Sequence, residues 1–232
     1  GGNVHVIIDG GKACSATVPG NSLARLRAHA SVEFVEPDIQ TTVPHGELGR
    51  ECGHHDDGEE PPPEEPPAED PPPPTPSPLP TGINRIDAEA SSAASGDGQG
   101  TVDVDIAVLD TGIDLDHPDL NVVQNKTWVF GTTTGDDVYG HGSHVAGTCA
   151  AKVDGQGHVG VAPGARLWAY KVADQTGTGF LSTLLVGIWD VPNQAASNDV
   201  AVICMGFSGT SSILDQALTD SVAAGVVYAV AA

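Results

Sequence analysis

The chain has 232 residues, enough for one or two domains. Acidic residues outnumber basic residues by 31 to 9, and the net charge at pH 7 is −22. This charge argues against nucleic acid or an anionic membrane surface as a partner, because both attract positively charged proteins. No apolar run reaches the roughly 18 residues of a membrane-spanning helix, so no membrane span is predicted.

The four cysteines are widely spaced and form no Cys-x-x-Cys pair. A zinc site or a dithiol redox motif is therefore not expected, and the redox compartment stays open. The sequence begins at Gly1 rather than at a methionine, which favours a fragment or a processed product.

Residues 1–40 have the pattern of a small mixed segment. An apolar run at 4–8 predicts a strand. Helical spacing over 23–30 follows a polar cap at 21–22, and this predicts a helix. Alternation of apolar and polar residues at 32–34 predicts a second strand.

Residues 41–80 differ sharply in composition. Ten acidic residues lie within 47–70, and twelve prolines lie within 61–80. Such a segment cannot bury a core, because prolines favour extended polyproline II and the acids repel one another. We interpret it as a stiff, disordered linker, and the His-His-Asp-Asp run at 54–57 as a polar patch rather than a metal site.

Residues 81–232 alternate between strand-like and helix-like segments. This order indicates β-α-β units, which build a parallel sheet covered by helices. The sequence therefore predicts an α/β fold, with a mostly parallel sheet flanked by helices and preceded by the small α/β segment. Active sites in such sheets form at the carboxyl ends of strands. Strands are predicted at 102–110, 165–173, 199–207 and 226–232, and helices at 144–153, 181–191 and 212–225, with Pro192 ending or kinking the second helix.

Asp110 and His141 are the first candidates for chemistry. Asp110 ends a predicted strand before a Thr-Gly turn, where a carboxylate can orient a histidine or merely cap the turn. His141 opens a predicted helix between two glycines, which allow close approach of backbone or substrate. An imidazole held by a buried carboxylate is a general base with a fixed tautomer. His144 lies one helical turn further without a neighbouring glutamate, so we interpret it as a bystander rather than a zinc ligand.

The segments around both residues resemble a known family. "VLDTGIDLDHPDL" contains Asp110 and "GHGSHVAGT" contains His141, and they resemble the aspartate and histidine motifs of the subtilisin-like serine proteases. The resemblance continues through "GVAPGARLWAYKV", "GTGFLSTLLVGI" and "GVVYAVAA", and it covers essentially all of residues 81–232. Within the first zone, "ACSATVPGNSLARLRAHASVEFVEPD" resembles the end of the family's inhibitory propeptide.

This resemblance implies a serine endopeptidase that hydrolyses polypeptide substrates through an Asp-His-Ser triad. Asp110 would orient the imidazole and His141 would act as the base. The family's serine, and the asparagine that donates to the oxyanion, would lie beyond Ala232, so the chain alone is expected to be inactive. Ser211 in "FSGTSS" is rejected as the nucleophile because it precedes the helix predicted at 212–225 and lacks the Met-Ala that follows the family's serine.

The same resemblance implies further site residues. One edge segment would pair with an extended substrate, and one strand end would line the primary specificity pocket, although its sequence departs from the family's usual Ser-Leu-Gly-Gly. Asp119 and Asp154 match possible ligands of a structural calcium ion, and no organic cofactor is implied. The substrate-binding residues implied are Gly177, Thr178 and Gly179 in the edge segment, and Gly206, Phe207, Ser208 and Gly209 at the strand end.

The predicted organisation follows from these matches. Residues 1–40 would be the C-terminal part of a propeptide that acts as chaperone and inhibitor, 41–80 the linker, and 81–232 the N-terminal portion of the catalytic domain. The mature enzyme is predicted to begin between about residue 40 and Thr81, and to be secreted and monomeric. Two alternatives remain open. One is a shortened, catalytically inactive relative that binds peptides or proteases. The other is an adhesive tract built on the proline-rich segment, which leaves the candidate catalytic residues unexplained.

Overall fold

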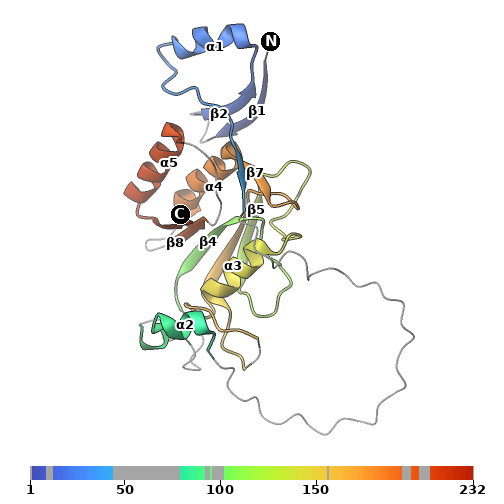
Figure 1. Cartoon of the computed structure of the whole chain (residues 1–232), viewed down its shortest axis with the longest axis vertical. Helices are drawn as coiled ribbons and strands as arrows, with labels where there is room; N and C mark the ends of the chain where they lie inside the picture. Colours follow the sequence, from blue (N-terminus) through green and yellow to red (C-terminus); the bar gives the residue numbers. More distant parts are fainter. Residues whose placement is uncertain are drawn as a thin grey trace, which may run out of the picture.

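The computed structural model describes residues 2–8, 13–43, 79–91, 95, 102–155, 157–194, 200–203 and 210–231. Within these residues the fold is α/β, as the sequence predicts, with a parallel sheet between helices and a small strand-and-helix segment near the N-terminus (Figure 1). The elements in chain order are β1 (Asn3–Ile8), β2 (Ala13–Thr17), α1 (Gly20–Arg27), β3 (Gln40–Thr42), α2 (Thr81–Arg85), the 3₁₀ helix η3 (Ala88–Ala90), β4 (Asp105–Asp110), β5 (Val122–Thr127), α3 (His141–Ala150), β6 (Arg166–Lys171), β7 (Thr178–Phe180), α4 (Leu181–Gln194), β8 (Val200–Ile203), α5 (Ser212–Ala223) and β9 (Val227–Val230).

The central sheet has five strands in the order β5-β6-β4-β8-β9, and every neighbouring pair is parallel. β4 is the middle strand, and all six of its residues are buried. A parallel strand covered on both faces requires a continuous apolar run, and Ile106–Leu109 supplies it. The carboxyl end of β4 therefore brings Asp110 to the edge where active sites of parallel sheets form.

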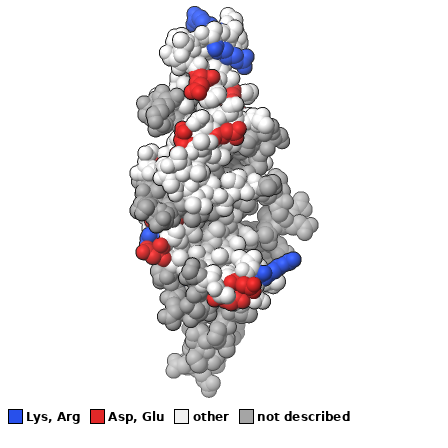
Figure 2. All heavy atoms as spheres, turned by 90° about the vertical axis from the view of Figure 1, so that its left-hand side faces the viewer, with Lys and Arg blue, Asp and Glu red and all other residues white. Residues whose placement is uncertain are grey.

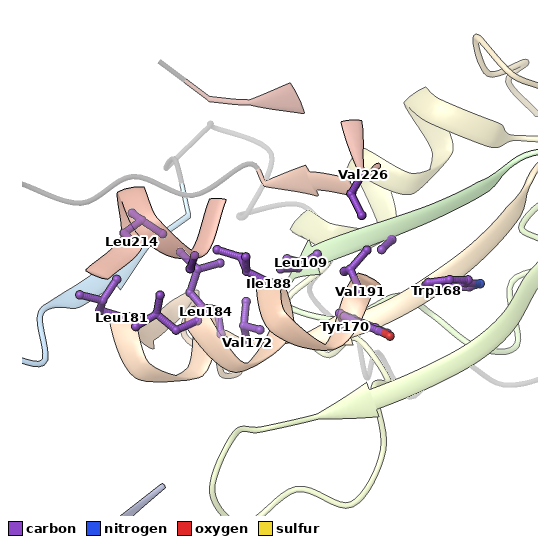
Figure 3. Close-up of a cluster of buried hydrophobic side chains, with 14 of the residues drawn as sticks. Leu109, Trp168, Tyr170, Val172, Leu181, Leu184, Ile188, Val191, Leu214 and Val226 are labelled. Atoms are coloured by element: carbon purple, nitrogen blue, oxygen red, sulfur yellow. The ribbon is translucent and has the colours of Figure 1, made fainter. Parts of the chain in front are cut away.

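Helices cover the two faces of the sheet. Leu109 and Tyr170 belong to one buried cluster, with apolar side chains of α4 and α5 (Figure 3). Val108 and Ala169 belong to a second cluster, with Ala146 of α3. Successive residues of β4 and β6 thus alternate between the two clusters, as the two-residue period of a strand requires.

A short strand, β3, connects the N-terminal segment to the part of the chain that holds the central sheet. β1 and β2 form an antiparallel hairpin, and α1 follows. Further along, β3 pairs antiparallel with β7, which directly precedes α4 (Figure 1). β3 spans the boundary predicted at residue 40, and residues 44–78 of the predicted linker lie outside the described residues.

Two expectations for the N-terminal segment are wrong. Residues 32–34 form no strand. The N–H of Val32 donates instead to the carbonyl of His29 at 2.9 Å. The helix α1 begins at Gly20 without a side-chain cap and ends at Arg27, three residues before the predicted end.

Pro192 does not end its helix at the residue before it. α4 continues to Gln194, so Pro192 lies within the last turn. Proline lacks the N–H that would bond the carbonyl of Ile188, and the Tyr228 hydroxyl donates to that carbonyl instead, at 3.4 Å. The Asn193 side chain likewise donates to the carbonyl of Trp189 at 2.9 Å, so the carbonyls of Ile188 and Trp189 both accept a side-chain hydrogen bond.

Figure 2 shows where charged side chains lie on one face of the described surface. On the face in Figure 2, the basic side chains of described residues lie apart from one another and do not merge into a positive patch. Among the described helices, none is both long enough and apolar enough to cross a membrane.

Candidate active site

Asp110 and His141 meet at the carboxyl end of the central strand. Asp110 is the last residue of β4 and is fully buried, whereas His141 is the first residue of α3. The Nδ1 atom of His141 lies 2.9 Å from each carboxylate oxygen of Asp110. Because a carboxylate accepts hydrogen bonds, this contact places the proton on Nδ1 and leaves Nε2 as the acceptor nitrogen.

The turn after β4 fixes the direction of the Asp110 carboxylate. The backbone N–H of Thr111 donates to Asp110 Oδ1 at 2.6 Å. The hydroxyl of Thr111 accepts a bond from the N–H of Gly142 at 3.0 Å, which ties the turn to the start of α3. Position 142 must be glycine, because a Cβ there would collide with the carbonyl oxygen of Gly112. The close contact of turn and helix keeps the Asp110 carboxylate within hydrogen-bond distance of the His141 imidazole.

Asp137 anchors the N-terminus of the helix that carries His141. Its carboxylate accepts from the N–H of Gly140 at 2.9 Å and from the N–H of Ser143 at 2.9 Å. It also accepts from the Ser143 hydroxyl at 2.7 Å. A carboxylate at this end satisfies unpaired N–H groups and interacts favourably with the helix dipole. Sequence reasoning assigned Asp137 no role, although an acidic residue shortly before a helix start is an available signal.

The environment changes the pKa of both groups in the pair. The hydrogen bond with Asp110 raises the pKa of His141 above its usual value, while partial burial of the ring opposes the shift. Burial raises the pKa of Asp110, and the hydrogen bonds from His141 and Thr111 oppose that shift. An imidazole that is backed by a carboxylate can take up a proton at Nε2 during a reaction and later return it.

His144 lies outside this pair. It is an exposed residue of α3, one turn beyond His141, and its backbone N–H donates to the carbonyl of Gly140 at 3.0 Å. Among the described residues, no group of three or more histidine, cysteine, aspartate or glutamate side chains is arranged to hold a metal ion.

The edge segment Gly177–Gly179 carries a bound strand of the same chain. Thr41 of β3 pairs with Gly179, and the N–H of Val43 donates to the carbonyl of Gly177 at 2.9 Å. Gly177 has φ +75°, and a Cβ there would press on the side chains of Val43 and Tyr139. Glycine at 177 therefore allows both the left-handed turn and the close approach of the paired strand.

The paired strand buries alternate side chains in this edge. Thr41 and Val43 are buried, whereas Gln40 and Thr42 are exposed. Tyr139, two residues before His141, approaches the same glycine as Val43, so the bound strand and the segment before α3 meet at Gly177. Sequence reasoning did not single out Tyr139.

Two carboxylates just upstream of β3 bind the N-termini of α5 and α4. Glu36 accepts from the Ser211 hydroxyl at 2.7 Å and from the N–H of Ser212 at 2.9 Å. Asp38 accepts from the N–H of Ser182 at 2.9 Å and from its hydroxyl at 2.7 Å. Both contacts place a negative charge where helix N–H groups are unpaired.

Two further candidates from the sequence are the implied specificity pocket and Ser211. Residues Gly206–Gly209 of the implied specificity pocket lie outside the described residues. The Ser211 hydroxyl accepts from the N–H of Leu214 at 3.2 Å as the cap of α5, and it donates to Glu36. That hydroxyl is thus engaged at a helix end, which is consistent with its rejection as a nucleophile.

Asp119 and Asp154 lie beside each other, as a shared ligand role would require. Burial raises the pKa of Asp119, and the neighbouring carboxyl of Asp154 raises it further. The nearby Lys152 ammonium opposes this effect and donates to the carbonyl of Pro118 at 2.6 Å. Carboxylate oxygens are ligands of the kind that Ca²⁺ prefers, and the proximity of these two carboxyls is the only feature of such a site among the described residues.

We expect Asp110→Asn to lower the pKa of His141, because the substitution removes the carboxylate that raises it. NMR titration of the histidine side chains measures this change, and the pKa of His141 should fall below its wild-type value. Asp116→Asn, which removes an exposed carboxylate from the loop after β4, is the matched control and should leave the pKa of His141 unchanged. An unchanged or higher pKa of His141 in Asp110→Asn would contradict the coupling of the two residues.

The sequence of this chain is similar to those of known proteins. Residues 101–232 match the family model described as the subtilase family, Peptidase S8. Subtilisin Savinase of Lederbergia lenta is 39% identical over 153 residues, which cover 66% of this chain and 55% of that protein. Subtilisin E of Bacillus subtilis (strain 168) is 41% identical over 158 residues, covering 66% of this chain and 39% of that protein. The chain thus spans about half or less of the length of these relatives. Because the family model matches more than half of the chain, the chain belongs to the subtilase family.

Proposed function

We propose that this protein is a serine endopeptidase that hydrolyses peptide bonds in polypeptide substrates. The observation that carries the proposal is the contact of His141 Nδ1 with the buried Asp110 carboxylate at the carboxyl end of β4, in a chain that belongs to the subtilase family. A carboxylate–imidazole pair at this edge of a parallel sheet is suited to activating a hydroxyl nucleophile.

In the proposed reaction, Nε2 of His141 accepts the proton of a serine hydroxyl as that oxygen attacks the substrate carbonyl carbon. His141 then returns the proton to the nitrogen of the leaving amine as the peptide bond breaks. Water attacks the resulting acyl-enzyme with the same imidazole as the base. Asp110 holds the imidazole in one tautomer and stabilises the imidazolium. Among the described residues, none is assigned as the serine or as the oxyanion donor.

The substrate would bind as an added strand. The edge Gly177–Gly179 pairs with β3 in an antiparallel ladder, and a substrate segment would take the place of β3 there. Backbone hydrogen bonds hold any extended peptide, so polypeptides in general are the proposed substrate class. Residues 206–209 would line the primary specificity pocket.

We further propose that the N-terminal segment is an inhibitory propeptide. β3 occupies the proposed substrate edge, and Glu36 and Asp38 bind the N-termini of α5 and α4. These contacts would hold residues 36–43, the tail of the propeptide, across the site until the chain is cut. The cut would give a mature enzyme that begins between about residue 40 and Thr81, as predicted from the sequence.

The proposed enzyme is secreted and acts as a monomer. A structural Ca²⁺ would be held by Asp119 and Asp154, where it would offset the repulsion between the two carboxylates. The ion would stabilise the loop that follows α3 and would take no part in the chemistry.

His141→Ala is expected to reduce hydrolysis by about 10⁴-fold or more, because the serine loses its base. His144→Ala, one helical turn away, should keep activity within about threefold of the wild type, since an exposed surface substitution removes no catalytic contact. The assay is kcat/KM on a peptide substrate with the mature protein. Comparable losses in the two variants would contradict the assigned roles. An inactive wild type would favour the peptide-binding alternative.

Asp38→Ala should weaken inhibition by the tail about tenfold, because three hydrogen bonds to a charged acceptor are lost, two from Ser182 and one from the Ser15 hydroxyl at 2.7 Å. The measurement is the lag before activity appears in freshly folded precursor. Glu33→Ala removes an exposed carboxylate of the same segment and is the matched control. Equal lag times in Asp38→Ala and wild type would count against the inhibitory role.

Thr41→Val should act in the opposite direction. Thr41 is fully buried against the edge strand, and within the described residues its hydroxyl has no hydrogen-bond partner. Replacing an unpaired buried hydroxyl with a methyl group should tighten tail binding by about 1 kcal/mol and lengthen the lag. A shorter lag would show that the hydroxyl is bonded in solution.

Removal of calcium tests the proposed metal site. We expect a chelator to lower the melting temperature of the wild type, because a cation bound only by the folded state stabilises it. Asp154→Asn should reduce the difference between the chelated and the calcium-loaded melting temperatures. The control is Asp87→Asn, between α2 and η3 and distant in sequence from Asp154, which should leave this difference unchanged. No effect of the chelator on the wild type would rule out a stabilising calcium ion.

A further inference from the structure

Lys171 is a buried cation that the proposed reaction does not use. It is the last residue of β6, and only 2% of its surface is exposed. Its ammonium donates to the backbone carbonyl of Thr111. Long cationic side chains are almost never fully buried without a specific partner, so the position requires an explanation.

The partner of Lys171 is the residue that orients the candidate catalytic pair. Thr111 donates its N–H to the carboxylate of Asp110 and accepts the N–H of Gly142 at its hydroxyl. Its carbonyl is the remaining polar group, and Lys171 holds that group from the neighbouring strand. The end of β6 also holds Asp110 itself, because the N–H of Val172 donates to the carbonyl of Asp110 at 2.8 Å.

Four carboxylates act on Lys171, from β4, from the segment before α3 and from the residues after β6. Asp110 lies on β4, Asp136 and Asp137 lie in the segment before α3, and Asp174 follows β6. Burial lowers the pKa of Lys171, and these four carboxylates oppose that shift. Asp137 is the carboxylate that anchors the N-terminus of α3 beside His141. Lys171 thus interacts with the supports of both members of the pair.

A purely structural role is the competing explanation. Lys126 is an example of such a role in this chain, because its ammonium bonds Asp190 at 2.6 Å and links β5 to α4 away from the pair. A structural lysine would change stability when replaced, but it would leave the Asp110–His141 hydrogen bond as it is. The two explanations therefore differ in a measurable property of His141.

We propose that Lys171 is a positioning residue, whose ammonium fixes the Thr111 carbonyl and so aligns the Asp110 carboxylate with the imidazole of His141. The role rests on the proposed hydrolytic function, but the alignment itself is a property of the folded pair. It can therefore be tested with and without turnover.

The spectroscopic test uses the Nδ1 proton of His141, whose low-field NMR resonance reports the hydrogen bond to Asp110. Lys171→Met removes the ammonium at nearly constant volume, and the resonance should move upfield or broaden by exchange. Lys126→Met is the matched control and should keep the wild-type resonance. A wild-type resonance in folded Lys171→Met overturns the proposal. If that variant does not fold, Lys171→Leu decides by the same two readings, because its side chain has no donor for the Thr111 carbonyl.

The kinetic test uses the mature protein. Lys171→Met should lower kcat about tenfold with KM within about twofold, because misplacing catalytic groups by 1 Å can slow a reaction by about 10²-fold. A change confined to KM, or equal effects of Lys171→Met and Lys126→Met, overturns the proposal. If the wild type shows no hydrolysis, the proposed function fails, and the resonance of His141 still decides the role of Lys171.

Discussion

The structure depends on one buried carboxylate. Asp110 lies at the end of the central strand without access to water, and such a group is stable only when hydrogen-bond donors surround it. Thr111 and His141 supply those donors, from the turn after β4 and the first residue of α3. The need to satisfy Asp110 therefore fixes where the turn, the helix and the imidazole lie, and the candidate chemistry follows from the same contacts.

A second constraint concerns the unpaired N–H groups at helix starts. Asp137, Glu36 and Asp38 each place a carboxylate at the N-terminus of a helix, at α3, α5 and α4 respectively. One of these contacts orients the candidate base, and the other two fasten the N-terminal segment to the body. The same electrostatic principle thus serves both the proposed catalysis and its proposed inhibition.

Much of this arrangement can be predicted from the sequence. The apolar run before Asp110 predicts a buried parallel strand, and the glycines around His141 predict a helix start close to backbone. No local sequence pattern predicts the pairing of β3 with β7, because a three-residue strand has no periodicity of its own and forms only where a partner edge exists. The burial of Lys171 was also not predicted, because a lysine at a strand end normally indicates that the position is exposed to solvent. Its burial follows from tertiary contacts that no local pattern encodes.

The central claim is that His141 is the base beside a serine nucleophile. A peptidyl chloromethyl ketone tests it most directly, because an imidazole placed beside a serine that attacks the ketone is alkylated far faster than any other imidazole. Mass spectrometry of the labelled mature protein should find the alkylated nitrogen on His141. An adduct on His144, or no adduct on a folded protein, would contradict the claim.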